Sequence, residues 1–398
     1  MRDDLELFYA KAFYIQIVMK ILHVITGMRK AAGTSVFAGE VANELVAKGH
    51  EVSIAVADPK CDDCYKLDPR VKLIRFDEVV VGDYDVVHIH ALWSPVLSKI
   101  AKSAYRAGVK VVWSPHGMLT PWALKNKWWK KLLGLVLYQY WALRNADLIH
   151  ATAQSEVDDV RRLGLKNEIV IAPLGVRLKE DKHHRTPIPS TYTSEQKHTL
   201  LFVSRVQRKK GLPNLLDAWA RLPCELRGDW TVRIVGPDQD GHTAELVAQA
   251  DKLGILDEVA FVGPRYDADL DAEYDAANLF VLPTHSENFG SVVIEALAHR
   301  VPVICTKEAP WEELETYKCG WWIDDNVDAL KTALMDALGC VERGEGARLG
   351  EKGLALVKSK YDWTVIGKTL ADAYWSVLHG CEKGRCVECD ELYDSCSP

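Results

Sequence analysis

Short apolar runs alternate with segments of helical periodicity along most of the chain. An apolar run at residues 21–26 is followed by a helical pattern at 36–47 and a second apolar run at 51–56. This order is a β-α-β unit, which predicts parallel strands with helices on the faces of the sheet. Four more strands are expected before residue 180, at residues 85–93, 111–118, 147–152 and 169–176.

The same alternation starts again after a polar stretch that contains Pro187 and Pro189. Apolar runs at 200–205, 231–236, 259–263, 279–283 and 301–306 predict a second parallel sheet. We therefore expect an α/β protein with two Rossmann-like, doubly wound domains. The predicted parts are an N-terminal extension (1–18), a first domain (19–180, completed by a C-terminal helix at 361–380), a linker (181–198), a second domain (199–360) and a Cys-rich, disordered tail (381–398).

Composition narrows the classes of function. The chain has 398 residues with a net charge of −7, and its pI is near 6.0, so no nucleic-acid partner is expected. No apolar run reaches the ~18 residues that cross a bilayer. The first residues are acidic and do not form a secretory signal. We expect a cytoplasmic protein that can lie at the inner face of the cytoplasmic membrane.

Candidate chemistry gathers where the strand at 279–283 ends. A loop leads through Gly290 and Ser291 into a helix, whose first amide groups suit an anion such as a diphosphate. Glu287 before the helix and Glu295 one turn inside it would repel that anion, but they can accept hydrogen bonds from hydroxyl groups on either side. This pattern indicates a nucleotide sugar. The alternative is that both carboxylates are solvated and bind nothing.

Two cations follow the first strand of the second domain. Arg205 ends that strand and Lys210 stands at the start of the next helix, which is a suitable place to neutralise a departing diphosphate. The alternative is a solvated basic turn.

These residues resemble a known pattern. Glu287, seven residues and Glu295, with Phe-Gly between them and Ala-Leu-Ala after them, is similar to the signature of retaining glycosyltransferases of family 4, which have the GT-B fold. The resemblance implies sugar transfer from a nucleotide-diphosphate sugar to a saccharide or lipid-linked saccharide across a cleft, without metal or cofactor, in cell-surface polysaccharide, lipopolysaccharide or glycoconjugate synthesis. It implies donor-binding roles for Gly33, Arg205, Lys210, Glu287, Asn288, Phe289, Gly290, Ser291 and Glu295.

Within that set, the resemblance places the diphosphate at Arg205, Lys210 and the amides near Gly290. It places the ribose at Glu295 and the transferred sugar at Glu287.

Histidines follow two strands of the first domain. We expect His88 and His90 to lie on opposite faces of their strand, so that only one of them reaches the ligand edge, and we assign His90 to the acceptor side. His116, which precedes Gly117, resembles the family's histidine on that side. The catalytic candidates are thus Glu287, His116, Arg205 and Lys210. A lone buried histidine is more often structural, and that alternative stays open.

Residues 121–144 predict a helix in which lysines and tryptophans interleave. Lys127, Trp128, Trp129, Lys130 and Lys131 suggest a surface that contacts an anionic membrane. The alternative is a core helix whose lysines face water.

The chain departs from the family pattern at three places. Ser204 stands where glycine is usual, Leu174 replaces a common asparagine, and residues 309–311 (Ala-Pro-Trp) occupy a loop that often carries paired glycines. The third departure leaves the donor sugar open. Two other functions stay open as well: a sugar-nucleotide epimerase of the same architecture, and an inactive nucleotide-binding membrane scaffold.

Overall fold

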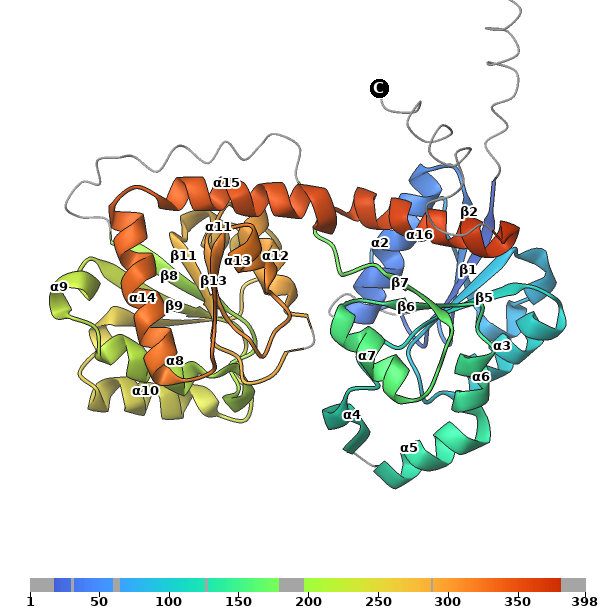
Figure 1. The fold of residues 1–398 in the computed structure, drawn as a ribbon, viewed down its shortest axis with the longest axis horizontal. Helices are drawn as coiled ribbons and strands as arrows, with labels where there is room; N and C mark the ends of the chain where they lie inside the picture. Colours follow the sequence, from blue (N-terminus) through green and yellow to red (C-terminus); the bar gives the residue numbers. More distant parts are fainter. Residues whose placement is uncertain are drawn as a thin grey trace, which may run out of the picture. The chain divides into compact units, whose positions relative to one another are not determined.

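The computed structural model describes residues 18–29, 32–59, 65–125, 128–178, 197–287 and 289–380. The chain forms two compact units, which we treat separately (Figure 1). The first unit runs to Pro173 and resumes at Trp363, and the second comprises Leu174–Asp362. The N-terminal extension, most of the linker and the tail lie outside the described residues. The chain enters the second unit a few residues before the expected boundary at 180, since Leu174 and Val176 pack against the second core.

The first unit contains a parallel sheet in the order β3-β2-β1-β4-β5-β6-β7. Its strands are β1 (Lys20–Val24), β2 (Glu51–Val56), β3 (Lys72–Arg75), β4 (Val86–His90), β5 (Lys110–Ser114), β6 (Leu148–Ala151) and β7 (Glu168–Ile171). The helices are α2 (Gly33–Ala47), α3 (Pro95–Arg106), α4 (Pro121–Lys125), α5 (Trp128–Gly134), α6 (Tyr140–Arg144), α7 (Gln154–Arg162) and α16 (Trp363–His379), with 3-10 turns η1 (Phe76–Glu78) and η2 (Val81–Asp83) and the π-helical turn η3 (Leu135–Gln139).

Different helices pack on the two faces of this sheet. Val87 and Ile89 of β4 share a core with Leu97 and Ile100 of α3. Side chains alternate along a strand, so the residues between them point to the other face. There α2 and α16 pack against each other and cover the sheet.

The second unit contains a parallel sheet in the order β10-β9-β8-β11-β12-β13. Its strands are β8 (His198–Val203), β9 (Trp230–Val235), β10 (Val259–Gly263), β11 (Leu279–Leu282), β12 (Val303–Thr306) and β13 (Gly320–Ile323). Its helices are α8 (Leu212–Ala220), α9 (Cys224–Arg227), α10 (His242–Lys252), α11 (Asp267–Ala276), α12 (Ser291–Ala298), α13 (Glu313–Thr316), α14 (Val327–Glu342) and α15 (Gly346–Leu356), with 3-10 turns η4 (Arg208–Lys210) and η5 (Leu256–Glu258) and the π-helical turn η6 (Val357–Tyr361). The prediction of two Rossmann-like parallel-sheet domains is confirmed.

Candidate functional site

The loop between β11 and α12 is anchored in the core of the second unit. Gly290 precedes α12 with φ of 79°, which favours glycine, and a Cβ there would lie 3.3 Å from Cγ of Glu287. Phe289 is buried against Trp311, whose Nε1 donates to the Phe289 carbonyl at 2.6 Å. The Phe289 side chain therefore packs into the core, and the donor-binding role expected for Phe289 is left to its backbone. Asn288 lies outside the described residues.

Lys210 and Glu287 form an ion pair at this loop, although 77 residues separate them. Both side chains are largely buried, at 9% and 18% exposure. Gly211 makes the approach possible, because its φ is 68° and a Cβ would lie 1.8 Å from the Pro283 carbonyl oxygen. The backbone of His285 also donates to the Lys209 carbonyl at 2.9 Å. A cation and a carboxylate thus meet at the C-terminal ends of the neighbouring strands β8 and β11.

Arg205 follows β8 and is exposed. Its Nη1 donates to Oε1 of Gln239 at 3.3 Å. The guanidinium is therefore accessible to an anion, in contrast to the buried ammonium of Lys210.

Glu295 lies one turn inside α12 and borders a cavity of about 300 Å³ in the second unit. The Tyr274 hydroxyl donates to Oε2 of Glu295 at 2.9 Å. Burial raises the pKa of Glu295, while hydrogen bonds from Tyr274 and Ser291 act in the opposite direction. The cavity is also lined by Asp271 and His299. The carboxylate can therefore be reached from a space large enough for a sugar ring, and Tyr274 orients it.

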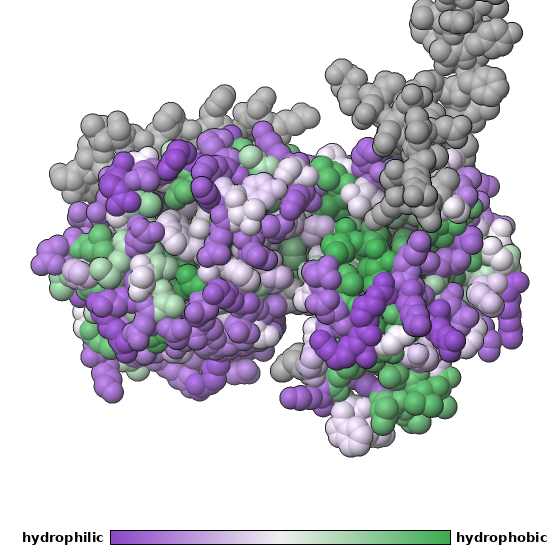
Figure 2. All heavy atoms as spheres, in the orientation of Figure 1, coloured by the Kyte–Doolittle hydropathy of each residue, from purple (hydrophilic) through white to green (hydrophobic). Residues whose placement is uncertain are grey.

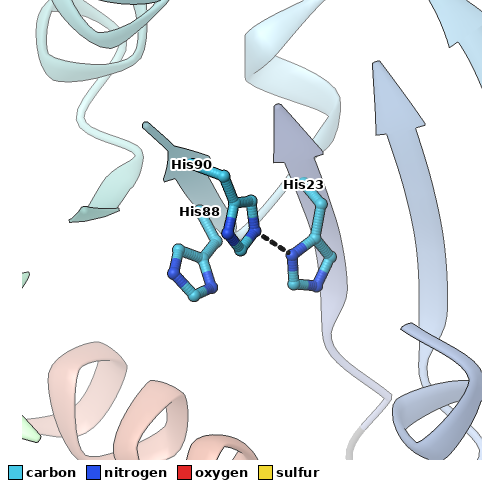
Figure 3. Close-up of side chains that lie close together, drawn as sticks. All are labelled: His23, His88 and His90. Atoms are coloured by element: carbon cyan, nitrogen blue, oxygen red, sulfur yellow. Dashed lines mark hydrogen bonds between the residues drawn. The ribbon is translucent and has the colours of Figure 1, made fainter. Parts of the chain in front are cut away.

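Histidines of β1 and β4 lie on one face of the sheet of the first unit. Figure 3 shows His88 and His90 on β4 and His23 on β1, with a hydrogen bond of 2.9 Å between His90 Nε2 and His23 Nδ1. The rings of His88 and His90 are 4.2 Å apart. The expectation that they face opposite ways was wrong, because residues two apart in a strand point to the same face.

His116 continues this cluster at its accessible end. It follows β5 with φ of 51°, is half-buried, and its Nε2 lies 3.0 Å from Nδ1 of His90. The next amide, of Gly117, donates to Oε1 of Glu156 at 2.5 Å. Glu156 is buried, which raises its pKa, and it also accepts from the amide and hydroxyl of Thr152. This carboxylate holds the turn that carries His116.

Four further residues of these sites were not predicted from the sequence: His23, His150, Tyr274 and Glu156. Of these, His23 had a signal in the sequence, because its strand places it in register with His88.

Gly33 is the first residue of α2. Apart from its chain neighbours and the backbone of its own helix, no heavy atom of the described residues lies within 4 Å of the place where its Cβ would be.

The segment predicted as one helix over residues 121–144 consists of α4, α5, η3 and α6, and Lys127 lies outside the described residues. Trp128 and Trp129 are 63% and 56% exposed. Lys130 is exposed with its ammonium over the Trp129 ring. Lys131 instead donates to the Ala123 carbonyl and lies over Trp93, so it does not extend a basic face. The remaining exposed apolar residues of this surface are Leu132, Leu133, Val136 and Leu137.

This apolar surface appears as a green area at the lower right of Figure 2, over the region of α5. The alternative of a core helix is therefore wrong for these side chains. In the described part of the chain, every helix is too short or too polar to span a bilayer.

Comparisons with known proteins agree with this architecture. Residues 31–180 match the family model described as Glycosyltransferase Family 4, and residues 186–353 match Glycosyl transferases group 1. A D-inositol 3-phosphate glycosyltransferase from Xylanimonas cellulosilytica is 28% identical over 312 residues, which are 74% of this chain and 72% of the relative. One from Corynebacterium kroppenstedtii is 23% identical over 91% of this chain and 88% of its own length.

Solved structures show the same fold. Anabaena HepE, solved in complex with UDP, has a TM-score of 0.68 at 19% identity, with 90% of this chain and all of that chain covered. WaaG, described as a glycosyltransferase involved in lipopolysaccharide biosynthesis, has a TM-score of 0.61 at 18% identity, with 89% and 99% covered.

Proposed function

Because the chain belongs to glycosyltransferase family 4, whose two family models together span most of it, we propose how its residues divide the reaction. A sugar passes from a nucleotide-diphosphate sugar to a saccharide or lipid-linked saccharide, with retained anomeric configuration and without a metal ion. The product belongs to a cell-surface polysaccharide, lipopolysaccharide or other glycoconjugate. HepE was solved in complex with UDP and, in another structure, with UDP-glucose, so uridine donors are the first to test.

The observation that carries the proposal is the ion pair of Lys210 and Glu287 beside the start of α12. Negative charge grows on the diphosphate as its bond to the sugar breaks. The Lys210 ammonium, the Arg205 guanidinium and the amides after Gly290 are cationic or dipolar groups that stabilise this charge without a metal. Glu287 is the acceptor for hydroxyl groups of the transferred sugar, and its pairing with Lys210 holds it in place before the donor arrives.

Glu295 has a separate role in this proposal. Its carboxylate borders the cavity in the second unit and accepts from Tyr274 and Ser291, so two lone pairs are used and others remain for the ribose hydroxyls. Ribose is remote from the reacting carbon, and this contact therefore contributes to binding rather than to the chemical step.

We also propose that the α5 surface contacts an anionic membrane, where a lipid-linked acceptor would be found. Exposed Trp128 and Trp129 supply amphipathic rings, and Leu132, Leu133 and Val136 supply apolar area. Lys130 supplies the positive charge. An apolar face of this size beside a lysine is typical of a surface that lies in the membrane interface.

A panel of nucleotide sugars tests the function. The full chain is incubated with each donor, and free nucleoside diphosphate and sugar epimers are followed by chromatography. Slow hydrolysis of one donor, made faster by an acceptor, is the expected result. Epimer formation would identify an epimerase, and binding without turnover would identify a scaffold. The anomeric configuration of the product, read by NMR, tests retention, and activity in the presence of EDTA tests independence from metal.

A further inference from the structure

Three histidines of the first unit form a hydrogen-bonded chain that leads from an accessible ring into the core. Nε2 of His116 lies 3.0 Å from Nδ1 of His90. Nε2 of His90 in turn lies 2.9 Å from Nδ1 of His23, the contact drawn in Figure 3. His116 is half-buried, whereas His90 and His23 are fully buried. We call these three residues the histidine chain.

The cluster of His23, His88 and His90 has the composition of a metal site, since their nitrogens lie within 4.8 Å of one another. The nitrogens are, however, already engaged. Those of His88 lie 2.6 Å from the Tyr374 hydroxyl and 2.5 Å from the Ser114 hydroxyl, and those of His90 face His23 and His116. Of the ring nitrogens of these three histidines, only Nε2 of His23 lacks a partner among the described residues. The arrangement is one of hydrogen bonds rather than of ligands around a common point.

A second chain beside the first is fixed in direction by its last member. Nε2 of His150 lies 2.7 Å from the Ala172 carbonyl, which can only accept, so this nitrogen carries the proton. Nδ1 of His150 then accepts from Ser114, Ser114 accepts from Nε2 of His88, and Nδ1 of His88 accepts from the Tyr374 hydroxyl. Every proton of this second chain is determined.

The histidine chain has two possible directions. Burial lowers the pKa of His23 and His116 to about 3 and that of His90 well below its usual range, so all three rings are neutral near pH 7. Each neutral ring has one N–H, and His90 must donate at one nitrogen and accept at the other. The protons therefore run either from His116 inward or from His23 outward, and the tautomers of all three rings are tied together.

The innermost nitrogen of the histidine chain, Nε2 of His23, decides between these directions. If the protons ran inward, Nε2 of His23 would be a buried N–H without an acceptor. If the protons run outward, the same nitrogen is unprotonated and carries a buried lone pair that accepts no hydrogen bond. For backbone groups, buried N–H donors without a partner are rarer than carbonyl acceptors without one, and we take the same order to hold for the imidazole nitrogen. Outward protons leave His116 with an N–H at Nδ1, the nitrogen that no described residue uses.

We propose that His23 and His90 are positioning residues that hold His116 as the Nδ1–H tautomer, which makes His116 a hydrogen-bond donor and not a base. The consequence for catalysis rests on the proposed function. In sugar transfer, His116 donates to an oxygen of the sugar or of the phosphate and does not take a proton from the acceptor hydroxyl. The histidine chain cannot conduct a proton away either, because it ends at Nε2 of His23, which is buried and has no hydrogen-bond partner among the described residues.

The test reads the tautomer directly in the full, unliganded chain. Histidines are labelled with ¹⁵N, and two-bond ¹H–¹⁵N correlations identify the protonated nitrogen of each neutral ring. A His116→Gln variant assigns the signal of His116. We expect Nδ1 of His116 to carry the proton at pH 7.5. A proton on Nε2 of His116 would overturn the proposal, and this measurement needs no folded variant of the core histidines.

Two substitutions of His23 test the coupling. His23→Asn can place an amide N–H where Nδ1–H stands, so the His116 tautomer should stay. His23→Leu removes the donor and should convert much of His116 to the Nε2–H form, with a loss in kcat/KM of roughly tenfold, the size of one hydrogen bond. An unchanged His116 tautomer in His23→Leu would also overturn the proposal.

His50→Leu is the matched control. His50 is buried, and its Nε2 also lacks a partner among the described residues, but its Nδ1 accepts from the Met19 amide. A comparable loss of stability without a change in the His116 tautomer is expected. The tautomer is measured without substrate, so a failure of this inference is distinct from a failure of sugar transfer in the donor panel.

Discussion

The ammonium of Lys210 donates to the carboxylate of Glu287 in a place where water hardly reaches either group. Such a pair is costly to break from one side, because the remaining charge stays buried without compensation. The pair also couples two functions that the proposal separates, the stabilisation of the diphosphate and the recognition of the sugar. Substitution on each side should therefore produce opposite effects on nucleoside diphosphate binding.

Glu287→Gln should lower kcat at least 100-fold and leave nucleoside diphosphate affinity equal or higher. The sugar loses its acceptor, while the charge of Lys210 becomes fully available to the anion. Lys210→Met should weaken that affinity and lower kcat as well. Calorimetry with UDP and the other nucleoside diphosphates, together with steady-state kinetics, checks both. Loss of nucleoside diphosphate binding in Glu287→Gln would reverse the roles assigned here.

Either single substitution should also destabilise the second unit by on the order of 3 kcal/mol, and the double variant should recover part of that loss. Arg221 and Asp328 provide a control pair in the same unit, with side chains 54% and 88% exposed. Arg221→Met should cost no more than about 1 kcal/mol. Equal losses for the two pairs in urea unfolding would contradict the buried character of the Lys210 pair.

Glu295→Ala should mainly raise the donor KM and weaken nucleoside diphosphate binding, with little change in kcat. Loss of a charge-assisted hydrogen bond corresponds to roughly 1.5–3 kcal/mol. Tyr274→Phe is the matched control, since it removes the hydroxyl that donates to Glu295 and keeps the carboxylate. If Glu295 serves only to hold Tyr274, both variants will lose stability and bind the nucleotide normally.

Trp128→Ala combined with Trp129→Ala should release the protein from vesicles that contain anionic lipid, without unfolding it. Both rings are mostly exposed, so their loss should change stability by about 0.5 kcal/mol or less, against 3–5 kcal/mol for a core aromatic. Co-sedimentation measures binding, and Lys130→Glu should make it weaker by ~1 kcal/mol or more.

Tyr266→Ala serves as control for this surface, because Tyr266 is an exposed aromatic residue of the second unit. Vesicle binding by the double tryptophan variant at the level of the original protein would rule out this membrane surface.

Local patterns predicted the elements well. The run that became β11, the following Pro283 and the apolar face after Gly290 are all neighbours in sequence, and strand, loop and α12 lie where expected. The family signature likewise led to Glu287 and Glu295, because their spacing is local. Lys210 was predicted as a cation near the diphosphate, and its partner was not, because contact across 77 residues depends on the order of strands in the sheet.

Side-chain direction was the main source of error. His88 and His90 share a face by the period of two, and correct use of that period would have predicted a histidine cluster with His23 in register. Phe289 sits in a glycine loop, where sequence cannot tell a ligand contact from an anchor, and Trp311 that buries it comes from another loop. Lys131 was expected at the membrane surface because of its place among the tryptophans and lysines, which does not tell where its side chain points. Its ammonium instead donates to the carbonyl of Ala123.

The buried histidines should make the first unit sensitive to acid. Burial lowers the pKa of His23 and His116 to about 3 and that of His150 to about 4, and it lowers those of His88 and His90 well below the usual 6.5. Between these values and 6.5 the unfolded chain binds protons that the folded unit does not. Stability is therefore fully present above pH 6.5 and is lost as pH falls, by up to about 1.4 kcal/mol per pH unit for each histidine.

Hydrogen exchange with mass spectrometry, corrected for intrinsic rates, can follow each unit separately between pH 7.5 and 5. Peptides from β1, β4 and β5 should lose protection steeply below pH 6.5, whereas peptides from β8 and β11 should change less, since no comparable histidine cluster is present in the described part of the second unit. His23→Asn removes one of the five titrating rings, so its slope should be shallower than that of the original chain. Parallel slopes for the two units would mean that the folded cluster takes up protons about as readily as the unfolded chain, and the lowered pKa values of these histidines would then be wrong.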